Sequence, residues 1–339
     1  MEKHFWDDIY KRDSIIGNKD FQTLYRAKQI LDNDSFVTIK EYFIKKGDDS
    51  NNKKVKELYE REIELMKDLL NSNCENFVKL IDCKEDIYDV RDDNYYYIIR
   101  EYCFGNLEDF ITMNENKLDP GLIQLIMKQL NNAFKILRDK NIIHRNIKPS
   151  NILFCYKEDT NFIMKLSGLN YYKKGNNSCP SINNNDFPNP PLNNENEKYD
   201  LWSIGIIMYF MYFGEYKNIN KISQINDKEL KDLIEKCIKN TISWNDYFKH
   251  QFFTKFYPDY NEDDDTDFSV LKELIDYGNT FLQYGQDMRR YLVPLTSAGK
   301  NRLNKLNEQY GEWGNKKENI KQLSDKLNEL KKKIIPNEK

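Results

Sequence analysis

The stretch "IIHRNIKPSNILF" (residues 142–154) decides the fold of this chain. Its polar residues follow the spacing His-Arg-x-x-Lys-x-x-Asn, formed by His144, Arg145, Lys148 and Asn151. Asn146 stands in the middle of this motif, and the stretch contains no carboxylate. An amide cannot accept a proton from a hydroxyl group at neutral pH, so the motif could retain an architecture without its chemistry.

The composition predicts a globular protein with no strong charge preference for its partners. The 339 residues suffice for one large domain or two ordinary ones, and 39% of them are hydrophobic. There are 52 basic and 55 acidic residues, which gives a net charge of −3. This balance argues against nucleic acid or an anionic membrane as an obligatory partner.

The cysteines and histidines predict neither a zinc site nor a disulfide scaffold. No Cys-x-x-Cys pair occurs, and the chain has six cysteines and three histidines. We therefore expect a reducing, cytoplasmic environment. The charged N-terminus does not resemble a signal peptide. The most apolar run, residues 201–213, has 13 residues, whereas a membrane span needs about 20, so it predicts a buried helix.

Periodicity predicts an α+β fold with a small sheet-rich lobe before a larger helical lobe. Strand-like segments occupy residues 14–30, 35–44 and 94–102, and an amphipathic helix is expected over residues 55–70. Helical patterns then dominate, at residues 106–114, 120–139, 200–212 and 227–239. Residues 173–197 are rich in Asn and Pro and are expected to form a loop.

The C-terminal part is predicted to be an acidic linker, residues 259–267, followed by a helical tail, residues 268–339. Apolar residues in the tail mostly recur three and four positions apart. Two interpretations remain open, a short coiled-coil seam and a helix that packs back on the body.

The order of the motifs resembles that of eukaryotic protein kinases over residues 8–258. Six stretches carry the resemblance: "VTIK" (37–40), "REIELM" (61–66), "REYCFGNLEDF" (100–110), "HRNIKPSNILF" (144–154), "EKYDLWSIGIIMY" (197–209) and "ISWNDYFKHQFF" (242–253). The resemblance implies a two-lobed fold that binds ATP and Mg²⁺. It also implies that Asp200 braces the catalytic loop. Fold alone does not imply function.

The resemblance implies a nucleotide site with several altered positions. Lys40 would contact phosphates and Glu62 would hold it, although the two could equally form a purely structural ion pair. Gly17 remains from the glycine-rich loop, whereas Lys19 and Gln22 occupy its other two glycine positions. Two positions of the adenine pocket are also altered. Thr38 replaces a small residue beneath the base, and Arg100 directly precedes the hinge residues Glu101–Cys103.

Arg100 is expected to pair with Glu62, plug the adenine pocket and compete with Lys40. A guanidinium buried at the back of the pocket needs a partner, and Glu62 is a plausible one. The alternative is that Arg100 extends to water.

The resemblance also implies that the catalytic and metal-binding carboxylates are missing. Asn146 stands at the position of the base, Lys148 is retained, and Asn151 matches one Mg²⁺ ligand. Gly168, Leu169 and Asn170 replace Asp-Phe-Gly, or a two-residue deletion joins Ser167 to Gly168. Neither alignment supplies a carboxylate, so we expect no metal site and no functional catalytic residue. An ion pair of the family is also missing, since Leu192 and Thr241 stand where Glu and Arg are expected.

Three functional hypotheses follow. The first is a pseudokinase that binds protein partners through its body or C-terminal helices, with no cofactor or at most weak ATP binding without Mg²⁺. The second is an active, atypical Ser/Thr kinase that uses ATP. The third is another nucleotide-dependent transfer on the same scaffold.

Overall fold

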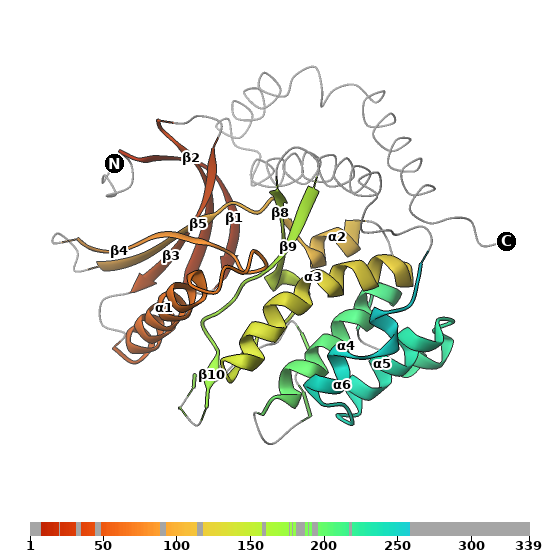
Figure 1. Ribbon diagram of the computed structural model, residues 1–339. Coiled ribbons are helices and arrows are strands. Elements are labelled where there is room, and N and C mark those ends of the chain that lie inside the picture. Colours follow the sequence, from red (N-terminus) through yellow and green to blue (C-terminus); the bar gives the residue numbers. More distant parts are fainter. Residues whose placement is uncertain are drawn as a thin grey trace, which may run out of the picture.

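The computed structural model describes residues 8–19, 21–31, 35–44, 49–88, 93–113, 118–157, 161–175, 177, 179–180, 187–188, 190–191, 196–216 and 219–257. The predictions for the linker and the tail, residues 259–339, and for Leu192 lie outside these residues. Figure 1 shows a sheet-rich lobe with one helix beside it and a larger lobe of helices, which confirms the predicted two-lobed α+β fold.

The first lobe is a five-stranded antiparallel sheet with the order β1-β2-β3-β5-β4. Its strands are β1 (Tyr10–Lys19), β2 (Gln22–Gln29), β3 (Phe36–Ile44), β4 (Leu80–Tyr88) and β5 (Asp93–Glu101). In β3, Val37 and Ile39 point to one face, and Thr38 and Lys40 point to the other, because side chains alternate along a strand. The strand therefore contributes Val37 and Ile39 to a small core on one face, whereas Lys40 faces the helix.

Helix α1 (Asp49–Leu70) packs against this sheet (Figure 1). Its apolar residues at 55, 58, 59, 63, 65, 66 and 69 are buried, as expected of an amphipathic helix. The helix begins six residues before the predicted start. Residues 49–54 are all polar, so hydrophobic periodicity could not reveal them.

The second lobe is built from helices around one long buried helix. They are α2 (Leu107–Met113), α3 (Pro120–Asp139), α4 (Lys198–Phe213), α5 (Lys228–Ile238) and α6 (Trp244–Phe248). The predicted buried helix is α4, in which every residue from Tyr199 to Met211 is buried. Asp119 caps α3, since its Oδ1 accepts hydrogen bonds from the backbone N–H groups of Gly121 and Leu122 at 2.8 and 3.2 Å.

Short strands frame the motif that decides the fold. Strand β7 (Ile142–Ile143) pairs with β10 (Lys173–Lys174), and β8 (Ile152–Lys157) pairs with β6 (Gly105–Asn106) and β9 (Asn161–Leu166). Residues 144–151 thus connect two strands, β7 and β8. This arrangement presents the loop beside the end of β9.

Direct contacts join the two lobes behind the site. The backbone of Leu166 in β9 hydrogen-bonds to Asn76 O at 2.8 Å and to Val78 N at 3.1 Å. Lys165 Nζ lies 2.8 Å from Glu101 Oε1 at the end of β5. These contacts fix the position of the sheet relative to β9.

One disulfide links the hinge to the second lobe. Cys103 bonds to Cys155 of β8, with their Cα atoms 4.4 Å apart. The sequence predicted no disulfide scaffold and, from that, a reducing compartment. The bond counts against this argument, because a reducing compartment keeps cysteines as thiols.

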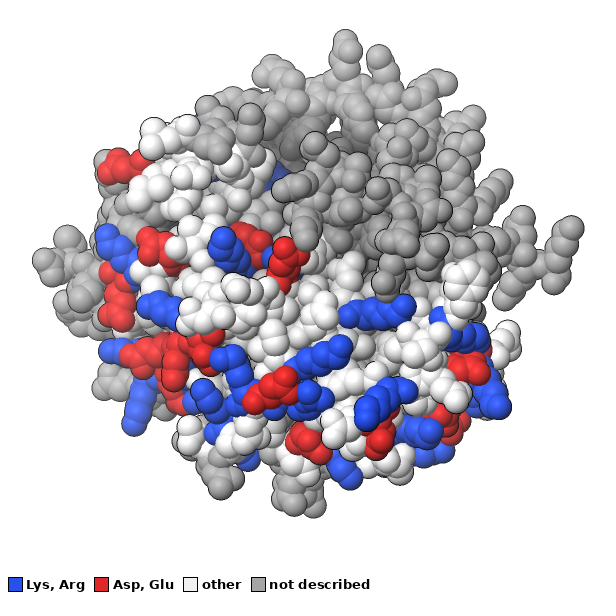
Figure 2. Space-filling view, viewed as in Figure 1, with Lys and Arg blue, Asp and Glu red and all other residues white. Residues whose placement is uncertain are grey.

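The described surface and helices agree with two predictions from the sequence, a balance of positive and negative charge and the absence of a membrane-spanning helix. Figure 2 shows basic and acidic side chains interspersed over the described part of the face in view. Among the described helices, none combines the length and the apolar character that a membrane crossing requires.

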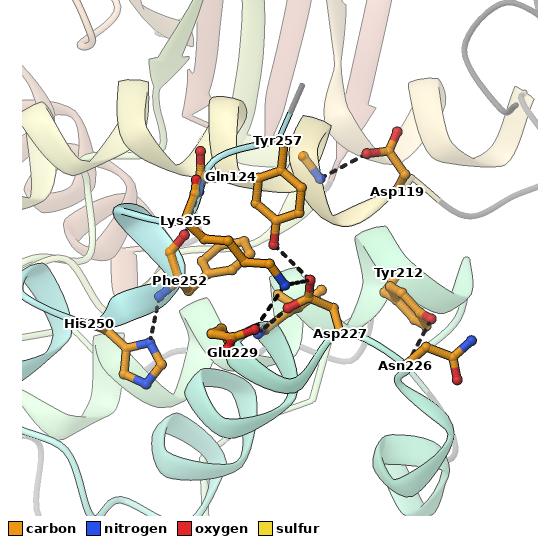
Figure 3. A network of polar contacts seen from close by, with 12 residues as sticks. Asp119, Gln124, Tyr212, Asn226, Asp227, Glu229, His250, Phe252, Lys255 and Tyr257 are labelled. Atoms are coloured by element: carbon orange, nitrogen blue, oxygen red, sulfur yellow. Dashed lines mark hydrogen bonds and ion pairs between the residues drawn. The ribbon is translucent and has the colours of Figure 1, made fainter. Parts of the chain in front are cut away.

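A polar network fastens the end of the second lobe (Figure 3). Lys255 Nζ lies 2.5 Å from Asp227 Oδ2 and 2.8 Å from Glu229 Oε2, and the Tyr257 hydroxyl donates to Asp227 at 2.9 Å. Asp227 also caps α5 by accepting a hydrogen bond from Leu230 N. Gln124 of α3 donates to the carbonyl groups of Phe252 and Lys255 at 2.5 and 2.9 Å. The network therefore ties residues 252–257 to both α3 and α5.

Replacing Lys255 with Met should destabilise the protein by about 1 kcal/mol, because it leaves the Asp227 carboxylate with fewer donors and the ion pair is partly exposed. Lys221→Met is the matched control, since the Lys221–Glu215 pair lies on the surface with both side chains about 40% exposed. Urea unfolding should show almost no change for this control. Equal losses for the two variants would contradict a special role for the network.

Candidate functional site

A buried ion pair connects β3 to α1. Lys40 Nζ lies 2.6 Å from Glu62 Oε2, with the two side chains only 7% and 2% exposed. The Tyr42 hydroxyl donates to the same oxygen. Burial alone would raise the pKa of Glu62, but the Lys40 ammonium and the two hydrogen bonds lower it below its ordinary value. The structure thus brings together the two residues expected to form the pair, and their role toward a nucleotide stays a prediction.

Arg100 does not form the expected pair with Glu62. Arg100 lies opposite Thr38 in the register of β3 and β5, whereas Lys40 lies two residues further along β3 and reaches Glu62 directly. Among the described residues, Arg100 Nε has no hydrogen-bond partner, and only 8% of the residue is exposed. The predicted Arg100–Glu62 pair that competes with Lys40 is therefore wrong, whereas the plugging of the adenine pocket by Arg100 stays a prediction.

Glu62 still affects Arg100 through space. Burial lowers the pKa of Arg100, and the nearby Glu62 carboxylate opposes this shift. Glu62 thus accepts a hydrogen bond from one cation, Lys40, and interacts with a second, Arg100, only through its charge.

The β1–β2 hairpin contains the positions expected for the glycine-rich loop. Gly17 pairs with Leu24, and Lys19 pairs with Gln22 at the end of the ladder. A Cβ atom at Gly17 would lie 3.1 Å from Leu24 Cδ1. Lys19 and Gln22 thus extend the two strands up to the turn at positions where the resemblance implied glycines.

Asp200 at the start of α4 holds the loop from residue 144 onward. Its carboxylate accepts hydrogen bonds from the backbone N–H groups of His144 and Arg145, at 2.7 and 2.8 Å. Arg145 has a φ of 65°, in the left-handed region that disfavours a residue with a side chain. The buried carboxylate offsets this cost, as the implied bracing role of Asp200 requires.

His144 is held in one tautomer by its two neighbours. Its Nε2 lies 3.1 Å from the carbonyl oxygen of Ser167, which can only accept, so Nε2 carries the proton. Its Nδ1 accepts a hydrogen bond from Asn146 N at 3.2 Å. Burial lowers the pKa of His144 to about 4, so the ring is neutral at pH 7.

Asn151 fills the space where an aspartate at position 168 would begin. Asn151 Nδ2 donates to the carbonyl oxygen of Asn146 at 2.8 Å. Gly168 has a φ of 78°, and a Cβ atom there would lie 2.5 Å from Asn151 Nδ2. Position 168 therefore favours glycine for two reasons, its left-handed backbone conformation and its close packing against Asn151.

The residues around this position do not fit Mg²⁺. Asn146, Asn151 and Gly168 are neutral, and Mg²⁺ prefers anionic oxygen ligands. Two carboxylates that the resemblance places in the site are already engaged, Glu62 by Lys40 and Asp200 by the backbone N–H groups of the loop. Among the described residues, no group of three His, Cys, Asp or Glu side chains could hold a metal ion. Asn146 Oδ1 is buried and has no hydrogen-bond partner among them.

The structure also adds residues that the sequence did not single out. Tyr42 is a third member of the Lys40–Glu62 pair, and its position two residues after Lys40 on a strand could have indicated a shared face. Arg61, Glu64 and Tyr172 form contacts between α1 and the segment after residue 170. No signal in the sequence linked these three residues, because the contacts are more than 100 positions apart.

A two-lobed fold with this ion pair and a catalytic-type loop braced by a buried aspartate defines a protein-kinase-like protein. The chain matches the protein kinase domain family over residues 10–277 and belongs to that family.

Three relatives illustrate the similarity. Serine/threonine-protein kinase atg1 of Dictyostelium discoideum is 29% identical over 271 residues, which cover 72% of this chain and 39% of that protein. Serine/threonine-protein kinase unc-51 of Caenorhabditis elegans is 27% identical over 292 residues, covering 75% and 32%. Serine/threonine-protein kinase atg1 of Penicillium rubens is 30% identical over 258 residues, covering 60% and 25%. The matched region is thus well under half of each of these relatives.

The neutral state of His144 predicts a pH-dependent contribution to stability. The pKa of His144 is about 4 in the folded protein, and that of an unfolded histidine is about 6.5. The unfolded state therefore binds more protons as the pH falls between these values, and stability is lost. Wild type should lose about 3 kcal/mol relative to His144→Gln between pH 7 and pH 4.

Urea unfolding of both proteins across this pH range measures the difference. Asp200, whose pKa burial raises to about 7, is present in both proteins, so its own effect largely cancels. A difference that does not vary with pH would contradict the neutral, buried state of His144.

Gly168→Ala should destabilise the protein more than Gly175→Ala, by about 1 to 3 kcal/mol. Both glycines have positive φ values, 78° and 57°, so both variants carry the same type of backbone strain. A Cβ atom at Gly175 would meet only Asn141 Nδ2, at 3.9 Å, whereas one at Gly168 overlaps Asn151. Adding Asn151→Ala should recover part of the loss, and thermal unfolding of the single and double variants tests this coupling.

Proposed function

We propose that the chain is a pseudokinase, a kinase-fold protein that binds other proteins and transfers phosphate slowly or not at all. The observation that carries the proposal is the packing of Asn151 against Gly168, beside the neutral Asn146. Losing a positioned base typically costs about 10² to 10⁴ in rate. Losing the charge of a bound metal ion raises the barrier by several kcal/mol more.

The same packing argues against weak retention of Mg²⁺. A carboxylate at position 168 would have to enter the volume that Asn151 occupies. Lys148 is retained, but a cation can replace neither the base nor the metal ligand. Nucleotide binding, if present, would then use Gly17, Lys40 and the hinge residues Glu101 and Cys103 without a metal ion.

The second candidate is an active Ser/Thr protein kinase. The specific observation in its favour is the family itself, because the three relatives described above are named serine/threonine-protein kinases. The intact Lys40–Glu62 pair is compatible with this candidate. Catalysis would require another group to supply the charge that Asn146 and Gly168 lack.

The proposed partners are proteins that contact the body or the C-terminal helices, in a cytoplasmic setting. The interspersed charges of the face in Figure 2 support a protein partner better than a polyanion. The tail as a partner-binding segment remains a prediction from its sequence alone.

Thermal melting with ATP, with and without Mg²⁺, separates the two candidates. A ligand that binds only the folded state raises the melting temperature. For a pseudokinase we expect either no shift or a small shift that Mg²⁺ does not increase. A rise of several degrees that requires Mg²⁺ would favour the active kinase.

Transfer of radiolabelled phosphate from ATP to a generic protein substrate tests the activity itself. We expect wild type and Lys40→Met to give the same background signal. Lys40→Met is the matched control because it removes the cation expected to contact phosphate. A wild-type signal at least about tenfold above this control would overturn the proposal.

A further inference from the structure

One side of α1 is held by the segment that follows residue 170. Arg61, Glu64 and Asp68 are three and four positions apart, so they share one side of the helix. A guanidinium nitrogen of Arg61 donates to the carbonyl oxygen of Tyr172, and Glu64 Oε2 accepts from the Tyr172 hydroxyl at 2.9 Å. Asp68 accepts from Lys140 Nζ at 2.8 Å. The helix is therefore attached to the second lobe at three successive positions.

Tyr172 contacts α1 through its backbone, its ring and its hydroxyl group. The Arg61 guanidinium lies over the ring, 4.5 Å from the centroid, and only 6% of Tyr172 is exposed. Burial, and then the bond to Glu64, raise the pKa of Tyr172 to about 12. The phenol thus stays protonated and remains a donor to Glu64 at physiological pH.

The same segment is attached to the catalytic-type loop on its other side. A guanidinium nitrogen of Arg145 donates to the carbonyl oxygens of Tyr171 and Pro180, at 2.9 and 3.0 Å. Arg145 is buried, and its backbone is held by Asp200. In addition, β10 pairs with β7, so that Lys173 lies opposite Ile143. On the side of the segment these anchors are backbone groups, which are present whatever the modification state of its side chains.

We propose that Tyr172, clamped between Arg61 and Glu64, is a latch that holds α1 against the second lobe and maintains the Lys40–Glu62 pair without a phosphate group on the segment. Glu62 is adjacent to Arg61 in the helix, so a movement of α1 away from Tyr172 also moves Glu62 away from Lys40. The latch stabilises the conformation of the body in which α1 contacts Tyr172. This inference is independent of whether the site transfers phosphate.

Hydrogen–deuterium exchange of the full chain tests the latch. Tyr172→Phe removes only the hydroxyl group, and Arg61→Gln removes the cation over the ring. Exchange in α1 and in residues 171–175 should be about fivefold faster in Tyr172→Phe and faster still in Arg61→Gln. Lys239→Gln is the control, since Lys239 forms an exposed pair with Glu235 on α5 and its side chain is 66% exposed. We expect no change in α1 for this control.

Phosphatase treatment of the wild-type protein tests whether the latch acts without a phosphate group on the segment after residue 170. Exchange in α1 should be the same before and after treatment. Two results would overturn the latch: wild-type exchange rates in both variants, or a treated wild type that exchanges as fast as Arg61→Gln. If Arg61→Gln also accelerates exchange throughout α4, that variant is globally unfolded, and Tyr172→Phe alone decides, because it preserves the ring.

Discussion

The buried carboxylate of Asp200 is the constraint on which the site depends. It accepts hydrogen bonds from the backbone N–H groups of His144 and Arg145. These bonds stabilise the left-handed backbone conformation of Arg145, which would otherwise be costly. This places the His144 ring against Ser167 and directs the Arg145 guanidinium toward the following segment. None of these contacts uses the side chain at position 146, so they hold the loop in place without a carboxylate at that position. Architecture and chemistry are thus separable in this loop.

The substitutions around this loop are consistent with one another. A glycine at position 168 allows the Asn151 amide to move into space that a carboxylate side chain would need, and Asn151 then bonds to the backbone of Asn146. An aspartate at position 146 would place a negative charge at a buried position beside the neutral Asn151 and Gly168. Such a charge is costly unless a cation accompanies it. The neutral residues at positions 146, 151 and 168 are therefore compatible with one another in packing and hydrogen bonding.

The sequence predicted the elements with strong periodicity and the residues that share a motif. Helix α3 has the predicted bounds, and the Lys40–Glu62 contact followed from motif order. Residues 14–30 were expected to be strand-like as one stretch, but they form two strands because the chain reverses near residue 20. The sequence could not place Arg100, because the register of β3 and β5 sets it opposite Thr38 while Lys40 reaches Glu62. Nor could it reveal the contacts of Tyr172, which join positions more than 100 residues apart.

The intact Lys40–Glu62 pair is weak support for nucleotide binding, and physical reasons explain its persistence. Removing one partner of a buried pair leaves an uncompensated charge, which typically costs about 3 to 5 kcal/mol. Tyr42 adds a further donor to Glu62, and the buried Arg100 nearby adds a further positive charge that benefits from the carboxylate. Loss of Glu62 would therefore leave two buried cations without their nearest anion. Stability alone therefore suffices to retain the pair in a site without catalytic carboxylates. A buried lysine–glutamate pair between β3 and α1 thus indicates the fold more reliably than it indicates a reaction.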